Sequence, residues 1–390
     1  MPAYGVGVVL SRILDEHREF LIDQPRLSAF RRAIDEVVKP DDVVVDLGSG
    51  TGILGLMACR AGAARVYALD ESGLTQLERE IFASNGFADR AICVKGLSTW
   101  ISLPELADVV ICDLIGRFGF DGGIVEYSAD ARRRLLKPGG TMIPSRIDLC
   151  VAPVEAPKIW DEVDFWRRSA EGFNLERAYL IAVNTGHPTK FQPQQILSEP
   201  AVIATIDLTR DFGTALSGKV TSIIRRGATL HGIGAWFTAE LSPSVRMTNS
   251  PLSEDTINRR GVFFPLDPPT RVEADERVQI GMTIVPNENL MSWTVKILNN
   301  GSSPRAQFAH STFRGMLLCP EDLRKAKPDF VPRLTSRGEA RRSVVNLCDG
   351  RRSLAAIEKE VYKRHPNLFA SLAEAAAFVA EVMIPYAYED

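Results

Sequence analysis

The chain lacks the cysteine and histidine patterns of disulfide-stapled or metal-binding proteins. Its six cysteines lie far apart with no CxxC pair, and its five histidines are equally scattered. This spacing predicts neither a disulfide framework nor a zinc site. Most of the cysteines fall in apolar segments, which indicates reduced packing residues and a cytoplasmic location.

Long apolar runs and a strong charge of one sign are also missing. No run of about 18 apolar residues occurs, and the early GVGVVL is too short for a secretory signal and lacks basic residues before it. A formal net charge of −3 creates no field that would attract nucleic acid or an acidic membrane, so we expect neither partner. The 390 residues are enough for about two or three globular domains.

The pattern of apolar residues divides the chain into four parts. Residues 1–30 have helical spacing with a break near Pro25, and residues 31–148 alternate strand-length runs such as VVVDL with helical stretches, as in a parallel sheet covered by helices. Residues 149–305 read as an antiparallel β domain with a helical arm inserted at about 157–197, and residues 306–390 turn helical again. The expected fold class is α/β: a Rossmann-like domain, an antiparallel β-barrel-like domain and a small helical C-terminal domain.

A glycine-rich segment, DLGSGTGILG at 46–55, follows an apolar run and opens a helical stretch. Glycine lets the backbone approach a ligand closely, and the helix N-terminus offers unpaired N–H groups. Asp70 ends the next apolar run, where a carboxylate can accept hydrogen bonds from both hydroxyls of a ribose. The segment therefore predicts a nucleotide-type ligand between the glycines and Asp70.

The residues leave three readings of this segment open. Gly50, Gly52 and Gly55 satisfy GxGxxG, which suits a dinucleotide of the NAD type, and a glycine turn without a ligand is the plainest alternative. Asp46 projects a negative charge toward the loop, where it would repel a pyrophosphate. The same charge suits S-adenosyl-L-methionine, which has no phosphate and a cationic amino-acid end, and we favour this cofactor.

The segment CDLIGRFGFDGGIVE at 112–126 carries carboxylates where an apolar run meets a glycine-rich loop. Asp113 ends the run directly, and Asp121 and Glu126 follow it. A carboxylate at the end of a buried strand and facing a loop is placed for chemistry. The alternative is that Asp113 only caps the loop through its backbone N–H groups.

Several stretches in one order resemble the protein arginine methyltransferase family over about residues 9–300. They are EHREFLIDQPRLSAFRRAI, VVVDLGSGTGILGL, RVYALDES, LLKPGGTMIPSRIDLCVAPVE, HGIGAWFTAEL, SPLSEDTINRRGVFFPL and VQIGMTIVPN. The resemblance implies a class I methyltransferase fold that uses S-adenosyl-L-methionine, with helices in residues 1–30 that cover the cofactor. It also implies a homodimer formed through the arm.

The same resemblance assigns residues to the cofactor. Arg26 would pair with the cofactor carboxylate, Asp70 would hold the ribose, and Ser98 and Thr99 fall where the family contacts adenine, although Thr99 replaces an acidic residue. The complete set is His17, Arg26, Asp46, Gly48, Gly50, Gly52, Asp70, Ser98 and Thr99.

Two departures from the family concern the methyl-accepting site. The family grips a substrate guanidinium with two glutamates, of which the first aligns with Asp113 and the second with Gly122, so Asp121 or Glu126 would have to supply the second carboxylate. The Thr-His-Trp loop of the family aligns with TIN at 256–258. A guanidinium stays charged, so its methylation requires carboxylates that hold its charge and its orientation. Asp113 alone could instead orient an amine or an imidazole, or remove its proton. The altered spacing suggests a different acceptor without excluding arginine.

The C-terminal part lies outside this family's pattern. Within 330–385, NLCDGRRSLAAIEKEV resembles the winged-helix peptide-binding domains of the pyrroloquinoline-quinone peptide chaperone family. That resemblance implies a leader peptide bound by strand addition to a sheet edge. The alternative is a helical extension that packs on the catalytic domains or on a second copy.

The function expected from these observations is methyl transfer from S-adenosyl-L-methionine to a side-chain nitrogen of a peptide or protein, as in a ribosomal peptide modification enzyme. Asp113, with Asp121 or Glu126, would orient the acceptor. Two alternatives stay open: a small-molecule N- or O-methyltransferase, and a catalytically silent scaffold that binds S-adenosyl-L-methionine.

Overall fold

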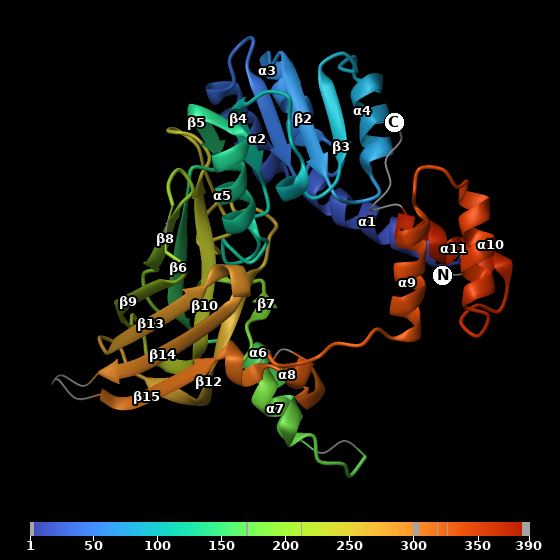
Figure 1. Cartoon of the computed structure of the whole chain (residues 1–390). Helices are drawn as coiled ribbons and strands as arrows, with labels where there is room; N and C mark the ends of the chain where they lie inside the picture. The colour runs from blue at the N-terminus through green and yellow to red at the C-terminus, as the bar shows by residue number, and fades with distance from the viewer. Residues whose placement is uncertain are drawn as a thin grey trace. The chain divides into compact units, whose positions relative to one another are not determined.

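Figure 1 shows the computed structural model, which describes residues 4–168, 171–211, 213–298, 304–317, 319–325 and 327–383. The chain divides into two compact units. Residues 14–317 form the larger unit, and residues 1–13 with 318–390 form the smaller one. Helix α1 (Tyr4–Ile22) has residues in both units.

A five-stranded parallel sheet forms the first part of the larger unit, with the strand order β3-β2-β1-β4-β5. The strands are β1 (Val43–Leu47), β2 (Arg65–Asp70), β3 (Ala91–Lys95), β4 (Ala107–Cys112) and β5 (Leu136–Ile143). The connecting helices are α3 (Ile53–Ala61), α4 (Thr75–Ser84), η1 (Ser98–Trp100) and α5 (Ile124–Arg134). All five residues of β1 are buried, as expected for a β-branched run in the centre of a parallel sheet.

The strand order places the carboxyl ends of β1 and β4 at the point where the order reverses. In open α/β sheets such a switch point leaves a crevice in which ligands bind. Helix α2 (Gln24–Val37) precedes β1; its N-cap Asp23 accepts a hydrogen bond from the backbone N–H of Arg26, and Pro25 lies in its first turn. The break expected near Pro25 is therefore the junction of α1 and α2.

After β5, the larger unit consists of antiparallel sheets and an inserted helical segment (Figure 1, green to orange). One sheet has the order β7-β12-β10-β6-β8, with β11 paired to β10, and the other has the order β15-β14-β13-β9. The strands are β6 (Arg146–Val154), β7 (His187–Thr189), β8 (Ala201–Asp207), β9 (Leu216–Ile223), β10 (Ala228–Glu240), β11 (Arg246–Thr248), β12 (Gly261–Val272), β13 (Arg277–Val285), β14 (Leu290–Leu298) and β15 (Pro304–Ser311). Two 3-10 turns border β14 and β15, η4 (Pro286–Glu288) and η5 (Thr312–Gly315).

One apolar core joins the parallel sheet to the barrel-like sheets. Buried side chains of both parts belong to a single cluster. At the centre, the ring of Phe118, from the loop after β4, lies 5.8 Å from that of Phe264 on β12, which lies 5.0 Å from that of Trp293 on β14. The two domains expected from the sequence therefore share a core, which explains why they form one compact unit.

The expected arm contains α6 (Pro157–Asp164), η2 (Phe165–Arg167) and α7 (Glu176–Ala182), followed by β7 and η3 (Pro193–Gln195). Trp160, Val163 and Tyr179 pack with Trp236 of β10 in a separate buried cluster. The base of the arm is thus fixed to the barrel-like domain by apolar contacts.

The smaller unit contains the helices α8 (Pro320–Lys325), α9 (Ser336–Leu347), α10 (Leu354–Arg364) and α11 (Leu372–Met383). Thr335 and Ser353 cap α9 and α10, and residues of α9, α10 and α11 form a core of their own. Between 319 and 383, the described residues include no strand, so they contain no sheet edge for strand addition. Across the described part of the whole chain, no helix is both long and apolar enough to cross a membrane.

Candidate functional site

The glycine-rich loop between β1 and α3 brings the backbone close to helix α1. Gly48, Gly50 and Gly52 all have positive φ, of 67°, 59° and 78°. A Cβ on Gly50 would lie 2.1 Å from Cε1 of His17, so the imidazole would have to shift, and the positive φ favours glycine whatever the space. The loop and His17 therefore form one continuous wall.

Asp70, the last residue of β2, links this loop to the next one. Its Oδ2 accepts a hydrogen bond from the backbone N–H of Gly50 at 2.9 Å, and its Oδ1 accepts one from that of Ser72 at 2.7 Å. An ionised carboxylate can accept about four hydrogen bonds, so Asp70 can accept further hydrogen bonds from the hydroxyls of a ligand.

Two carboxyl groups lie buried behind the loop. Asp46, 1% exposed, accepts a hydrogen bond from the backbone N–H of Gly55 at 2.8 Å, and Glu78 of α4 is fully buried. Burial, and then repulsion by Glu78, raises the pKa of Asp46 to about 7; burial likewise raises the pKa of Glu78 to about 7. A positively charged ligand nearby would favour the ionised forms of both groups.

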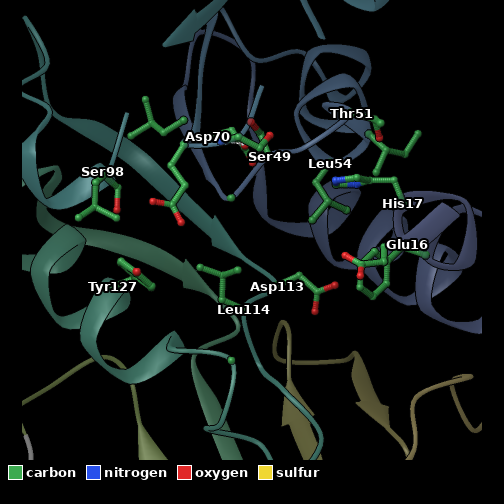
Figure 2. Close-up of a pocket in the computed structure, with 18 of the residues that line it drawn as sticks. Glu16, His17, Ser49, Thr51, Leu54, Asp70, Ser98, Asp113, Leu114 and Tyr127 are labelled. Atoms are coloured by element: carbon green, nitrogen blue, oxygen red, sulfur yellow. Dashed lines mark hydrogen bonds between the residues drawn. The ribbon is translucent and has the colours of Figure 1, made fainter. Parts of the chain in front are cut away.

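These elements enclose a cavity of about 500 Å³. In Figure 2, Asp70 and Ser49 border one side of it, Asp113 and Leu114 the opposite side, and His17 and Glu16 approach from α1. Its size and its mixture of apolar and acidic walls fit a nucleoside with a charged tail. We refer to it as the first cavity.

The structure places five of the nine expected cofactor residues on the wall of the first cavity: His17, Arg26, Gly48, Asp70 and Ser98. Asp46, Gly50, Gly52 and Thr99 are not among its lining residues, because Asp46 lies behind the loop and His17 covers Gly50. The wall also includes residues that the sequence reasoning missed, namely Glu16, Phe20, Leu21, Ser49, Thr51, Ile53, Leu54, Leu69, Glu71, Ser72, Gly96, Leu97, Leu114, Gly122 and Tyr127. Glu71 and Ser72 could have been predicted as cavity residues, since they directly follow Asp70 in the sequence.

A second cavity of about 570 Å³ shares part of its wall with the first. Glu16, Phe20, Asp113, Leu114 and Gly122 line both. Asp113 therefore lies where a ligand in one cavity would meet a ligand in the other.

Asp113 is held by two arginines. Nε of Arg26 lies 2.6 Å from Oδ2 of Asp113, and Nη2 of Arg259 lies 3.3 Å from the same oxygen. The three side chains are only 6%, 11% and 12% exposed for Arg26, Asp113 and Arg259. Burial alone would raise the pKa of Asp113, but the charges of Arg259 and Arg26 outweigh it and hold the pKa below its usual value. Such a carboxylate stays ionised and is a weak base.

The other expected acceptor carboxylates have different surroundings. Oδ1 of Asp121 accepts hydrogen bonds from the backbone N–H groups of Arg117 and Phe118, both at 2.8 Å, so this residue caps the loop. Asp121 lines the second cavity, whereas Glu126, in the first turn of α5, lines neither. The capping role considered for Asp113 thus belongs to Asp121.

Position 122, where the family has its second glutamate, is closed to side chains. A Cβ on Gly122 would lie 2.4 Å from the carbonyl oxygen of Leu114 and 2.8 Å from the backbone nitrogen of Gly116. Real Cβ atoms do not approach backbone so closely. The loop is therefore folded differently from one that carries a glutamate there.

The segment at 256–258 also reaches this region. The backbone N–H of Asn258 donates to Oδ2 of Asp23 at 2.8 Å, while Ile257 is buried. Arg259, which follows directly and pairs with Asp113, was not among the residues that the sequence analysis singled out. Within the described part of the chain, no cluster of three or more histidine, cysteine, aspartate or glutamate side chains could hold a metal ion.

Two family models match the chain. Residues 145–296 match the arginine methyltransferase oligomerization subdomain, and residues 30–147 match the ribosomal protein L11 methyltransferase family. The first match covers most of the antiparallel strands, and the second covers the parallel sheet and the glycine-rich loop.

Individual relatives agree with these matches. The chain is 26% identical to protein arginine N-methyltransferase 6 of Xenopus laevis over 291 residues, which cover 70% of this chain and 84% of that protein. It is 31% identical to a probable protein arginine N-methyltransferase 6 of Arabidopsis thaliana over 254 residues, which cover 62% and 58%. Among solved structures, a Trypanosoma brucei PRMT1 enzyme–prozyme heterotetrameric complex with AdoHcy has the same fold, with a TM-score of 0.69 and 22% identity over 76% of this chain and 96% of that one.

Proposed function

Because this chain belongs to the protein arginine methyltransferase family and is an S-adenosyl-L-methionine-dependent methyltransferase, we propose that it methylates a side-chain nitrogen of a peptide or protein. The observation that carries the proposal is the position of Asp113, on the wall that the first and second cavities share. A carboxylate there would contact ligands in both cavities and could align an acceptor with a methyl donor.

The first cavity fits the cofactor. Asp70 retains hydrogen-bonding capacity for the ribose hydroxyls, and the buried carboxyl groups of Asp46 and Glu78 provide negative charge behind the glycine-rich loop. Arg26 lines the cavity and would pair with the carboxylate of the cofactor, and Ser98 would lie toward the adenine. When bound, S-adenosyl-L-methionine supplies a methyl group on a positively charged sulfur.

The residues of the chain contribute orientation rather than proton abstraction. Asp113 is ionised and buried, and its two arginine partners fix its position. It would accept a hydrogen bond from the N–H of the acceptor and thereby direct the nitrogen lone pair toward the first cavity. Asp121 would act by holding the loop in shape, and Glu126 would contribute only if the loop rearranged.

We also propose a homodimer formed through the arm. Phe165, Trp166, Phe173 and Leu180, all within the arm, are exposed. Large apolar side chains exposed along one segment are typical of a protein–protein interface, and the matched oligomerization subdomain includes this segment. A monomeric mass in light scattering at micromolar concentration would contradict this proposal.

We further propose that the smaller unit binds a leader peptide of the substrate. Since the described residues of 319–383 are helical, the peptide would have to lie against the helices α9–α11. Deletion of residues 330–390 should then weaken methylation of a leader-bearing peptide but leave cofactor binding intact. Equal rates with and without this segment would contradict the proposal.

The experiment that tests the proposed function follows a labelled methyl group. Purified protein and S-adenosyl-L-methionine with a labelled methyl are added to an extract of the cells that make this protein. Label in a polypeptide, located on a residue after digestion, is the expected result. Label only in small molecules would overturn the proposal in favour of a small-molecule methyltransferase.

A further inference from the structure

The first cavity has two chemically different ends. In Figure 2, Asp70 lies between His17 on one side and Ser98 and Tyr127 on the other. Arg26 lies at the His17 end, because its guanidinium and the His17 ring neighbour the same phenylalanine ring of α1. Since Arg26 would pair with the cofactor carboxylate and Asp70 would hold the ribose, the adenine belongs at the opposite end, which we call the base end.

The base end is built from η1 and α5, which Arg134 holds together. Nη2 of Arg134 donates a hydrogen bond to the carbonyl oxygen of Ser98, and Nη1 donates one to that of Ile101, both at 2.8 Å. Nε of the same guanidinium donates to Oδ1 of Asp130 at 2.8 Å, which fixes it on α5. Tyr127 on α5 and Ser98 on η1 therefore keep a defined position relative to each other.

The ring of Tyr127 is fixed, while its hydroxyl is available to a ligand. A Cβ on Gly123 would lie 2.9 Å from Cε2 of Tyr127, so the ring packs directly against this glycine at the start of α5. Among the described residues, the hydroxyl has no hydrogen-bond partner. Burial, and then the negative charge of Glu71, raises the pKa of Tyr127 above its usual value. The hydroxyl thus stays protonated at neutral pH and can both donate and accept a hydrogen bond.

The 6-amino group of adenine is a hydrogen-bond donor and needs an acceptor at the base end. Thr99, which replaces an acidic residue of the family, does not line the cavity, whereas Tyr127, Ser98 and Glu71 do. Glu71 is exposed, where water competes for its carboxylate. The hydroxyl of Ser98 is carried by a short side chain, whereas the oxygen of Tyr127 is placed at the end of a ring that Gly123 holds in position. An acceptor that is fixed before the ligand arrives loses less entropy on binding, which favours Tyr127.

We propose that Tyr127 is a specificity-determining residue for the cofactor, and that its hydroxyl accepts a hydrogen bond from the 6-amino group of the adenine. A neutral hydroxyl on α5 would then do what no acidic side chain at position 99 does in this chain. This role depends on the cofactor that binds in the first cavity and not on which acceptor is methylated.

The test removes the hydroxyl and the amino group separately and together. Titration calorimetry on the full chain gives the dissociation constants of S-adenosylhomocysteine and of its analogue with purine in place of adenine, which has hydrogen where adenine has the 6-amino group. We expect the wild type to bind the purine analogue about fivefold more weakly than S-adenosylhomocysteine. Tyr127→Phe should show a difference of less than about twofold, because the partner of the amino group is already gone.

Two other variants control for the loss of a hydroxyl. Tyr67→Phe removes a phenol hydroxyl that donates to Glu105 and lies outside the cavity wall, and should keep the wild-type difference between the two ligands. Ser98→Ala removes the other hydroxyl of the base end; it can weaken the binding of both ligands but should keep the difference between them. Thermal unfolding shows whether each variant is folded before its binding is compared.

Three results would overturn the role of Tyr127. They are equal binding of the two ligands by the wild type, a difference in folded Tyr127→Phe as large as in the wild type, and loss of the difference in Ser98→Ala or Glu71→Gln instead. In each of these cases, labelled methyl on a polypeptide would still support the proposed function. Absence of label from every polypeptide, with the calorimetric result as expected, would overturn the proposed function alone.

Discussion

The two cavities that meet at Asp113 differ in how their charges are balanced. Behind the first cavity, the carboxyl groups of Asp46 and Glu78 are buried; the charges of Arg26 and Arg79 offset this burial only in part, and the pKa values of both groups are raised to about 7. At the second cavity, Asp113 has two arginine partners and a lowered pKa. The acidic groups behind the first cavity would therefore favour a positively charged ligand. The carboxylate of Asp113, at the second cavity, is already paired with Arg26 and Arg259.

From this difference we expect the two halves of the site to respond differently to substitution. The glycine-rich loop and Asp70 are held by local backbone geometry and hydrogen bonds, so we expect cofactor binding to persist when the acceptor loop changes. The acceptor half depends on long side chains that reach it from distant segments. Variants that affect one half alone would support this separation, and the substitutions below run from the largest expected effect to the smallest.

Asp70→Ala should abolish cofactor binding. The change removes a carboxylate that holds the glycine-rich loop through Gly50 and would hold the ribose, and two hydrogen bonds to a charged group are worth about 1.5–3 kcal/mol each. We expect S-adenosyl-L-methionine affinity to fall at least about 100-fold in titration calorimetry. Binding within about threefold of the wild type would show that the first cavity is not the cofactor site.

Asp113→Asn should lower turnover about 100-fold while cofactor affinity changes less than about threefold, since orientation of the acceptor is lost but the first cavity is kept. Turnover and calorimetric affinity measured on the same preparation separate the two effects. The variant should also unfold at a lower temperature, because two largely buried guanidinium groups lose their partner. Unchanged turnover would remove Asp113 from the mechanism.

The stability contribution of Asp113 has a defined pH window. Its pKa is lower in the folded protein than the usual value near 3.9, so the ion pairs stabilise the fold above that value. The contribution is lost only as the pH falls through the lowered folded pKa. Turnover of the wild type should therefore show no Asp113 titration between about pH 5 and 8.

Cofactor affinity should rise with pH between about 6 and 8. Asp46 and Glu78 have folded pKa values of about 7, so in the free protein they are partly protonated in this range, and a sulfonium favours their ionised forms. We expect the dissociation constant of S-adenosyl-L-methionine to fall about tenfold over this interval, and that of S-adenosylhomocysteine, which lacks the sulfonium, to change less. Identical pH profiles for the two ligands would contradict this mechanism.

The same two groups predict the opposite trend for the stability of the free protein. Their folded pKa values exceed the unfolded values near 4, so the folded state binds more protons than the unfolded state between about pH 4 and 7. The free energy of unfolding should accordingly decrease as pH rises through this window. Asp46→Asn should make both trends shallower, as urea titrations and calorimetry would show.

Gly50→Ala should have the smallest effect, a loss of cofactor affinity of roughly fivefold, because its Cβ would displace His17 from the wall of the first cavity. Gly86→Ala is the matched control, since Gly86 also has positive φ but no heavy atom within 4 Å of an added Cβ. Both variants should lose about 1 kcal/mol of stability through backbone strain, and only Gly50→Ala should lose affinity. If Gly50→Ala and Gly86→Ala bound the cofactor with equal affinity, movement of His17 would have no effect on cofactor binding.

The sequence predicted the cofactor half more fully than the acceptor half. The strands, the glycine-rich loop and the position of Asp70 follow from apolar periodicity and from the conformations that only glycine adopts, both of which are local properties. The expectation that Arg26 would serve the cofactor carboxylate did not include its ion pair with Asp113 at 2.6 Å. That pair joins residues 87 positions apart, and no local pattern encodes it.

By itself, the sequence determined the α/β fold class and the place of the glycine-rich loop between a strand and a helix, because backbone conformation and burial follow from the residue types along each segment. Only the tertiary structure decided that Arg259, 146 positions from Asp113, lies against its carboxylate, and that Gly122 has no room for a side chain. Such contacts depend on where the shared core places the segments, since long side chains and close backbone approaches have no signature in the spacing of neighbouring residues.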